Sequence, residues 1–479
     1  MKEKSLARNT LLYVVRVLSS MLFPLVTFPY ISRVLSPAGI GKYNFTNSII
    51  SYFSLLAALG ISTYAIREGA KTRNNKKEFE QIAQEMYSIN VYSTLVAYLL
   101  LMILIVSVPK LFDYRVLLMI LSFSFPLTTI GTEWIFNIYE DYAYITIRSI
   151  LFQAFSLLMM FLIVKNEGDV NKYAAITVVS SAGSNILNYN YSKKYFHHKI
   201  ILSRGLLRHL LPVLILFASA VASQIYVNLD TTMLGFIYGD YEVGIYASAT
   251  KVYNIARSIL TSFIIVITPR LAFYYSENKE KYKILLNDFL IGYSSIILPS
   301  CIGILCISKQ VIFILSGIDY LNAVPALKIL CIVLGFSTIG SFIANEIMVI
   351  CEQEKMILFA TILGAVINFV GNIFFIPYIG YIGASITTLI SEIVVFFVQI
   401  YIARKNIVWK NFVIQFIKVI IACIPMIIFS FFINQIKISI LLKTLCIVSF
   451  GIFSYIVILF LLKHFLILEI AKLIQKKGE

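Results

Sequence analysis

The sequence predicts an all-α membrane protein with about fourteen transmembrane helices. Apolar residues make up 59% of the 479 residues, charged residues make up only 13%, and the mean hydropathy is +0.86. Ordinary soluble proteins carry roughly 25% charged residues, so this chain lacks the polar surface that a soluble enzyme or binding module of its length needs. Its apolar runs are also long and continuous, whereas the strands of a transmembrane β-barrel alternate apolar and polar residues.

The apolar runs set the expected spans, because about 20 apolar residues cross a bilayer as a helix. Lys and Arg accumulate in cytoplasmic loops. With the N-terminus inside, about 26 of the 40 basic residues fall on the cytoplasmic side and about 10 fall opposite. An even number of spans then places both termini in the cytoplasm. The runs cover residues 10–35, 43–66, 86–108, 114–139, 143–165, 171–192, 209–234, 241–268, 285–307, 324–350, 356–376, 379–403, 412–434 and 438–466.

The sequence contains no residue pattern typical of a catalytic or metal-binding site. The six Cys lie in or beside apolar runs without a CxxC pair, and the four His lie beside basic residues at span ends. These are the positions of core and span-end residues rather than of a disulfide framework or a metal site. Phosphate-binding loops and soluble nucleotide domains are also missing from the sequence. We therefore expect no enzyme activity, cofactor, metal or nucleic-acid partner, and we expect a functional monomer.

A weak internal repeat predicts two lobes. Gly41 recurs as Gly244, and Glu133 recurs as Glu346, so the period is about 200 residues, or six spans. Both glutamates lie towards span ends, where structural pairing or capping is the expected role. An even number of spans per repeat gives both copies the same orientation, with their axis along the membrane normal. The expected organisation is an N-terminal lobe at 1–203, a C-terminal lobe at 204–405, and two additional helices with a basic cytoplasmic tail at 406–479.

Polar residues inside the spans mark the expected functional face, since polarity within a membrane is costly. The first two spans and their repeat partners each combine a polar stripe with an apolar back, as helices lining a shared aqueous cavity need. Ser and Thr stripes also join helices to one another, and that alternative stays open. The stripes comprise Arg16, Ser20, Thr27 and Tyr30; Asn44, Asn47, Ser48 and Ser51; Ser219, Ser223, Tyr226 and Asp230; and Thr250, Lys251, Asn254, Arg257 and Ser258.

The deepest charges point to an anionic cargo. Arg257 and Glu392 are expected nearest the midplane, with Lys251 nearer the outside and Arg16 one to two turns from the inner face. A guanidinium pairs bidentately with phosphate, and more strongly where water is partly excluded. Pairing with a carboxylate or with helix carbonyls is the structural alternative for each cation. Asp230 and Glu392 are either ion-coupling acids or structural partners.

Four stretches resemble the Wzx-type oligosaccharide flippases, within the superfamily that also holds multidrug exporters and lipid II flippases. The resemblance covers most of the chain and both halves. The stretches are RVLSPAGIGKYNFTNSI at 33–49, GISTYAIREGAKTRNN at 60–75, EWIFNIYEDYAYITIRSI at 133–150, and LDTTMLGFIYGDYEVGIYASATKVYN at 229–254.

This resemblance implies two six-helix lobes around a central cavity, plus two trailing helices, in a bacterial inner membrane. It implies alternating access and an undecaprenyl-pyrophosphate-linked oligosaccharide as cargo, moved from the cytoplasmic to the outer leaflet. Membrane lipids, a polysaccharide polymerase and glycosyltransferases are the implied partners. The cationic cavity of the family would consist here of Arg16, Arg148, Lys251 and Arg257, with Arg33 and Arg67 as further candidates.

Three other functions compete with this one. A lipid II-type flippase is a close variant. An ion-coupled exporter of amphiphilic cations would need an acidic site such as Asp230 or Glu392, and the presence of Arg16 with no acid in the first span argues against it. A scaffold or polymerase partner without transport activity would be supported by a large extramembrane loop, and the sequence has none.

Overall fold

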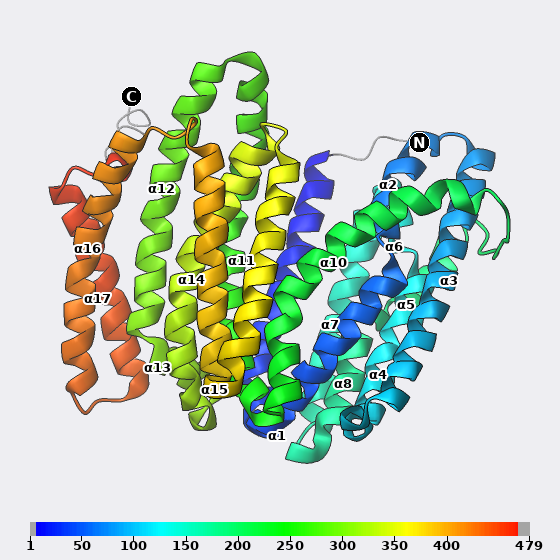
Figure 1. The fold of residues 1–479 in the computed structure, drawn as a ribbon, viewed down its shortest axis with the longest axis horizontal. Coiled ribbons are helices and arrows are strands. Elements are labelled where there is room, and N and C mark those ends of the chain that lie inside the picture. The colour runs from blue at the N-terminus through cyan, green and yellow to red at the C-terminus, as the bar shows by residue number, and fades with distance from the viewer. Residues whose placement is uncertain (1–5, 468–479) are drawn as a thin grey trace. The chain divides into compact units, whose positions relative to one another are not determined.

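The structure, a computed structural model, describes residues 6–467, and these residues form helices and no strand. Eleven of the helices are long and apolar enough to cross a membrane, which confirms the predicted all-α membrane fold. The chain forms two compact units, Met1–Gly244 (unit 1) and Ile245–Glu479 (unit 2). Figure 1 shows the helices of both units by chain order. The basic tail predicted at the C-terminus lies mostly outside the described residues.

Unit 1 is built around α1, which packs against α3, α7 and α10. Further packing joins α2 to α3 and α6, α4 to α8, and α5 to α9. Its elements are α1 (Leu6–Ala58), α2 (Ile61–Thr72), α3 (Lys76–Ser107), η1 (Pro109–Tyr114), α4 (Arg115–Ser122), α5 (Ser124–Gly131), α6 (Glu133–Ile138), α7 (Tyr142–Ile163), η2 (Glu167–Asp169), α8 (Val170–Val178), η3 (Val179–Gly183), α9 (Asn185–Ser192) and α10 (Leu206–Ile237).

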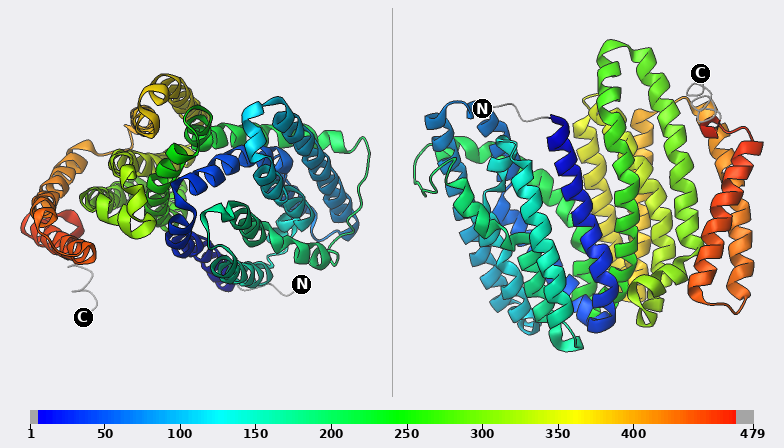
Figure 2. Two further views of the ribbon diagram at one scale, coloured as in Figure 1. Left: turned by 90° about the horizontal axis from the view of Figure 1, so that it is seen from below. Right: turned by 180° about the vertical axis from the view of Figure 1, so that it is seen from behind.

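Unit 2 begins within α11 (Asp240–Glu277) and is built on α12, which packs against α14 and α16. Helices α14 and α15 pair, as do α16 and α17, and the second pair runs side by side in every view (Figures 1 and 2). The remaining elements are α12 (Lys279–Cys306), α13 (Ser308–Ser316), η4 (Ile318–Ala323), α14 (Val324–Ile343), η5 (Ala344–Val349), α15 (Glu354–Ala403), α16 (Trp409–Gln435) and α17 (Ile440–Leu461).

The predicted count of fourteen spans is not confirmed. Helix α1 includes the expected span 10–35 and residues 43–58 of the expected span 43–66, with one break at Ser36, where φ is 60°. The rest of the second span continues into α2. Helix α15 likewise includes the spans 356–376 and 379–403, with a break at Ile379 and Gly380. The expected span 171–192 is divided among α8, η3 and α9. These three differences explain why the described residues form eleven long apolar helices where fourteen spans were predicted.

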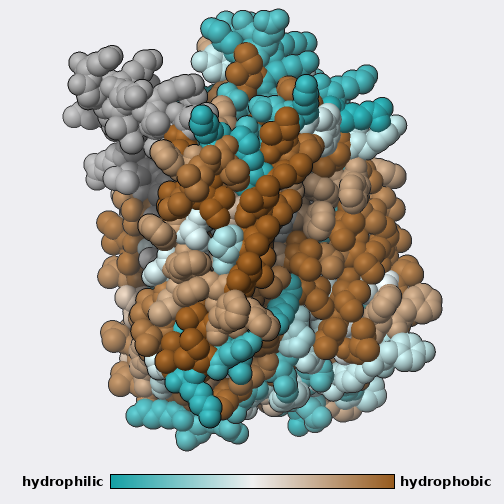
Figure 3. All heavy atoms as spheres, turned by 90° about the vertical axis from the view of Figure 1, so that its left-hand side faces the viewer, coloured by the Kyte–Doolittle hydropathy of each residue, from teal (hydrophilic) through white to brown (hydrophobic). Residues whose placement is uncertain are grey.

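The outer faces of the helices are apolar, as a lipid environment requires. On the face that carries α16 and α17, hydrophobic side chains form a broad band between hydrophilic surfaces at its two ends (Figure 3). Exposed side chains on these two helices include Phe431, Phe432, Leu445, Phe453 and Phe460. The chain is therefore a multi-pass membrane protein.

Two glycines related by the sequence repeat make a close reciprocal contact inside unit 1. A Cβ on Gly41 would lie 1.6 Å from the carbonyl oxygen of Asp240, and a Cβ on Gly244 would lie 1.8 Å from that of Pro37. Small residues permit this approach of two helix backbones. The contact explains why glycine stands at the same place in both copies of the repeat.

Candidate anion-binding site

Unit 1 brings together two of the predicted cations around one carboxylate. Arg16 of α1 donates through Nη2 to Oε1 of Glu133, at the start of α6. Arg148 of α7 lies on the other side, with its Nη2 3.7 Å from Oε2 of the same carboxylate. We call these three residues the arginine–glutamate cluster. They are 117 and 15 residues apart along the chain, so only the packing of α1, α6 and α7 brings them together.

The backbone before Glu133 is held in an unusual conformation. Thr132 has φ of 40°, a left-handed value that is rare for a β-branched residue. A side chain at Gly131 would collide with Asn185 of α9, because its Cβ would lie 2.5 Å from the Asn185 side chain. The tight approach of α5 and α9 thus fixes where α6 starts. Strained residues persist where the surroundings hold them, often at functional sites.

The charges of the arginine–glutamate cluster do not balance. Two guanidinium groups share one carboxylate, so the cluster carries a net positive charge. The side chain of Arg148 is only 5% exposed, and its Nε has no hydrogen-bond partner among the described residues. Its remaining contacts are weak: Nη1 lies 3.5 Å from the carbonyl of Ser184, and the guanidinium lies 5.9 Å from the centre of the Tyr144 ring. An anion with several acceptor oxygens would satisfy these donors.

Three of the predicted charges lie in unit 2. Arg257 and Lys251 lie on α11, and Glu392 lies buried on α15. Arg257 and Glu392 are both close enough to Tyr253 to act electrostatically on its hydroxyl, which donates to Ser337 at 3.0 Å. Lys251 and Glu392 have interaction partners of their own. Among the described residues, no carboxylate forms an ion pair with Arg257.

The predicted cavity-lining residues divide into exposed and packed positions. Asn47 and Asn254 are exposed. Asn44 and Ser51 instead donate to carbonyls of their own helix, at 2.8 and 2.6 Å. Tyr226 is half-buried and has a partner. These positions neither require nor exclude a shared cavity, so their role stays a prediction.

Several other predicted residues have structural contacts. Asp230 is buried with a partner, Arg33 donates to the carbonyl of Pro29, and exposed Arg67 pairs with Glu68 at 3.0 Å. Tyr30 donates to the carbonyl of Val164 at 2.7 Å. The hydroxyl of Ser48 accepts from Thr232 of α10 at 2.9 Å. The polar stripe that contains Ser48 therefore joins two helices, which is the alternative role that the sequence left open for such stripes. The side chains of Ser20 and Ser219 lie outside the described ones.

Unit 2 contains an apolar cavity of about 450 Å³. It lies between α12, α14, α15 and the start of α16, and its wall has no charged side chain among the described residues. Gly335 leaves space in this wall, because a Cβ there would meet only the Cys301 sulfur, at 3.8 Å. The residues that line this cavity include Cys301, Gly335, Phe336, Phe396, Trp409 and Phe412.

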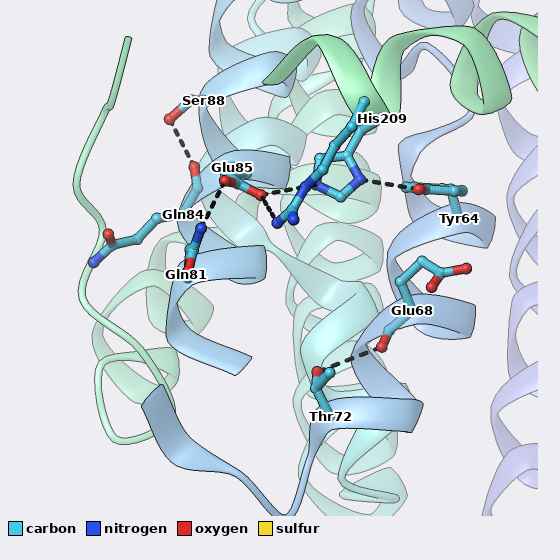
Figure 4. A network of polar contacts seen from close by, with 9 residues as sticks. Tyr64, Glu68, Thr72, Gln81, Gln84, Glu85, Ser88 and His209 are labelled. Carbon is cyan, nitrogen blue, oxygen red and sulfur yellow. Dashed lines mark hydrogen bonds and ion pairs between the residues drawn. The ribbon is translucent and has the colours of Figure 1, made fainter. Parts of the chain in front are cut away.

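A buried charge network escaped the sequence analysis. Glu85 of α3 is 2% exposed and accepts from Arg208 Nη2 at 2.7 Å, and His209 Nε2 lies 2.8 Å from the same oxygen. The other ring nitrogen of His209 shares a hydrogen bond of 2.9 Å with the hydroxyl of Tyr64 on α2 (Figure 4). The network thus fastens the first turn of α10 to α2 and α3. Glu85 lies one residue before the expected third span, so the sequence suggested a loop position and gave no sign of burial.

A second unpredicted network lies outside the long apolar helices. Asp141 accepts from Tyr191 at 2.9 Å and from Tyr195 at 3.1 Å, and Lys194 lies 3.3 Å away. Burial opposes the charge of Lys194, but hydrogen bonds to the two tyrosines outweigh it and raise the pKa of the ammonium group. Burial likewise raises the pKa of Tyr195 to about 12. The cluster of Tyr and Lys residues at 189–195 is the sequence feature that could have predicted this network.

Comparisons with known proteins agree on a family. Residues 6–274 match the family described as "Polysaccharide biosynthesis protein". The chain is 24% identical over 416 residues to a "Putative O-antigen transporter" of Escherichia coli (strain K12), covering 84% of this chain and 97% of that protein. It is 23% identical over 417 residues to the "Capsular polysaccharide biosynthesis protein CapF" of Staphylococcus aureus, covering 82% and 98%.

Solved structures share the fold. The structure of "Lipid II flippase MurJ, inward closed conformation" matches with a TM-score of 0.77, over 94% of this chain and 98% of that one. The sequence identity of this pair is 16%, so the likeness is one of fold.

Proposed function

Because the chain belongs to the polysaccharide biosynthesis protein family, in agreement with the resemblance seen in its sequence, we propose that it is a flippase for a lipid-linked oligosaccharide. The proposed cargo is an undecaprenyl-pyrophosphate-linked repeat unit of a surface polysaccharide. The protein would move it from the cytoplasmic to the outer leaflet of a bacterial inner membrane, with both termini in the cytoplasm. The relatives named for O-antigen transport and capsule biosynthesis support this class of cargo.

The arginine–glutamate cluster is the observation that carries the proposal. A pyrophosphate offers several charged oxygens. The cluster offers a net positive charge and a buried arginine whose Nε has no hydrogen-bond partner among the described residues. A guanidinium binds two phosphate oxygens at once, which a lysine cannot do. Partial burial strengthens this interaction relative to water. Lys251 and Arg257 are further candidate cations for the pyrophosphate, both in unit 2.

The polyprenyl chain needs an apolar environment while its head group moves. The cavity of unit 2 has the chemistry for such a chain, since its lining residues are aliphatic and aromatic. Transport by alternating access would expose the cationic residues first to one side of the membrane and then to the other. No bond of the cargo changes in this cycle, so the protein would act by binding and conformational change alone.

Three variants test the role of the cluster in cells that depend on this protein for surface polysaccharide. Arg148→Ala is expected to reduce surface polysaccharide at least tenfold, and Arg148→Lys should fall between it and wild type because one lysine cannot grip two oxygens. Arg73→Ala is the matched control, since it removes an arginine from an exposed pair with Glu140. Membrane insertion is checked by immunoblotting. Normal polysaccharide in Arg148→Ala cells would contradict the proposed site.

The identity of the cargo is tested by deleting the protein and analysing the lipids of the inner leaflet. A lipid-linked repeat unit should accumulate there. Accumulation of lipid II instead would identify a lipid II-type flippase, and a change in drug susceptibility with normal lipids would identify an exporter of amphiphilic cations.

The apolar cavity provides an independent test. Gly335→Leu should fill part of it and reduce transport, whereas Gly335→Ala should be tolerated, because its Cβ makes only an ordinary contact with Cys301. Equal transport by both variants would show that the polyprenyl chain does not use this cavity.

A further inference from the structure

Among the carboxyl groups of unit 2 that the structure describes, Glu346 is the most deeply buried. It lies in η5 and is 0% exposed. Its neighbours in sequence, Ile343, Ile347 and Met348, belong to a buried apolar core cluster that also includes residues of α11 and α12. An ionised carboxylate in such surroundings is very costly unless it is paired and fully hydrogen-bonded.

Glu346 lacks this compensation. Its Oε1 accepts a hydrogen bond from Thr268 of α11, and its Oε2 has no hydrogen-bond partner among the described residues. The hydroxyl of Tyr282 on α12 donates at 2.8 Å to the backbone carbonyl of Glu346 and not to its side chain. One hydroxyl donor is far less than the two or three donors that an ionised carboxylate requires when it is buried.

No cation offsets the charge either. Of the charged residues on the neighbouring helices, Arg270, Lys281, Lys283, Glu354 and Lys355 are exposed, whereas Lys251, Arg257, Asp288 and Glu392 are half-buried or buried. None of the ion pairs among the described residues includes Glu346. Tyr282 and, through it, Cys351 are titratable groups linked electrostatically to Glu346. Neither a phenol nor a thiol can carry a positive charge, so neither of them neutralises the carboxylate.

The repeat-related residue of unit 1 shows what a neutralised carboxylate looks like. Glu133 stands at the corresponding place in the first repeat, and it lies between Arg16 and Arg148. It is also partly exposed. The carboxyl groups that the sequence repeat relates thus have different partners, two cations at Glu133 and one hydroxyl donor at Glu346.

We infer that Glu346 is a proton-binding site, with a proton on its carboxyl group in this conformation. A neutral carboxylic acid removes the cost of burying a charge at this fully buried position. Glu346 lies in a π-helix, an irregular turn often found at functional sites. A change in the packing of η5 that admits water would release the proton, and the proton would rebind when the turn closes.

A consequence follows for energy supply, and this part rests on the proposed flippase function. A proton bound in one conformation and released in another couples the conformational cycle to the proton gradient. With one proton per cycle, a gradient of one pH unit changes the attainable accumulation of cargo about tenfold. Glu346→Gln, which is neutral in every conformation, removes this dependence.

Infrared spectroscopy of the purified full-length protein tests the proton directly. The wild type should show the carbonyl stretch of a protonated carboxylic acid at neutral pH, and Glu346→Gln should lose that component. Glu133→Gln is the matched control, because the Glu133 carboxyl group pairs with two arginines and should contribute nothing to the band. An unchanged band in Glu346→Gln overturns the inference. The wild type alone also decides the matter if the variant does not fold, since absence of any such band contradicts a protonated Glu346.

Transport assays then test the coupling. Proteoliposomes receive a fluorescent disaccharide linked through pyrophosphate to a short polyprenyl chain, and flipping is measured with and without a gradient of one pH unit. The wild type should respond to the gradient and Glu346→Gln should not. A full response in Glu346→Gln overturns the coupling. If the wild type does not flip this probe, the proposed function fails, while the infrared result still decides whether Glu346 binds a proton.

Discussion

The arginine–glutamate cluster makes a quantitative prediction about stability. Glu133→Gln removes the carboxylate and leaves Arg148 buried without a negative partner. Breaking a buried ion pair costs about 3–5 kcal/mol, whereas an exposed pair contributes about 0–1 kcal/mol. Here Arg148 is 5% exposed, but Glu133 is 34% exposed and the N–O distance is 3.7 Å. We therefore expect a loss of about 2–3 kcal/mol for Glu133→Gln, between these two limits.

A double-mutant cycle measures the interaction between Glu133 and Arg148 separately from the other effects of each substitution. Arg148→Met keeps much of the side-chain volume and removes the buried charge, while Glu133 retains Arg16 as its partner. We expect this variant to lose about 1 kcal/mol. Combined with Glu133→Gln, it leaves no buried charge at Arg148, so the double variant should be more stable than the sum of the single losses by about 1–2 kcal/mol. If Glu133 and Arg148 did not interact directly, the stability losses of the two single variants would simply add.

Thermal unfolding in one detergent at one heating rate measures these differences, because membrane proteins often unfold irreversibly. For a domain of 150–250 residues, 1 kcal/mol corresponds to about 2–4 °C in Tm. Glu133→Gln should therefore lower the Tm of unit 1 by about 5–10 °C. Glu68→Gln is the matched control, since Glu68 pairs with exposed Arg67 and Lys71 on α2. A loss in Glu133→Gln no larger than in this control would refute the reasoning.

Three further predictions concern unit 1. Glu85→Gln should destabilise the protein by about 3 kcal/mol and speed hydrogen exchange at the start of α10, whereas Glu80→Gln, at a more exposed pair, should do neither. Hydrogen bonds from Lys172 and two backbone amides lower the pKa of Asp169 to about 2. This stability is present above pH 4 and is lost as the pH falls through 2, so the Tm difference between wild type and Asp169→Asn should be constant from pH 7 to 5 and should vanish near pH 2. Gly41→Ala should lower Tm and folded yield, with a cost of about 3 kcal/mol or more, because its Cβ would overlap a backbone carbonyl, and Gly168→Ala, which meets no atom within 4 Å, should be neutral.

Much of the fold could be predicted because a membrane imposes a simple rule on composition. Each span must be apolar along its length, and that signal survives in a single sequence. The breaks within the long helices carried a weaker signal. Ser36 precedes Pro37, and proline disfavours a helical conformation in the residue before it, yet the sequence does not say whether a helix ends there or bends.

The candidate site could be predicted only as a set of separate cations. Arg16 and Arg148 were both identified, but their common partner Glu133 was interpreted only as a residue that pairs or caps. The contact between residues 16 and 133 depends on the packing of α1 against its neighbours, and no local pattern encodes it. Glu85 was missed for the same reason, since its burial depends on the position of α10, which begins more than 100 residues later.

The two copies of the repeat have kept their backbone contacts and changed their charges. Gly41 and Gly244 approach each other's helices in the same way, so any side chain at either position would disturb both. Glu133 and Glu346, by contrast, share a place in the repeat and differ in their partners. Packing at the glycines restricts what mutation can do, whereas a buried carboxyl group can be neutralised either by an arginine or by a proton. Under the proposed function, unit 1 would supply the anion site and unit 2 would supply the proton site.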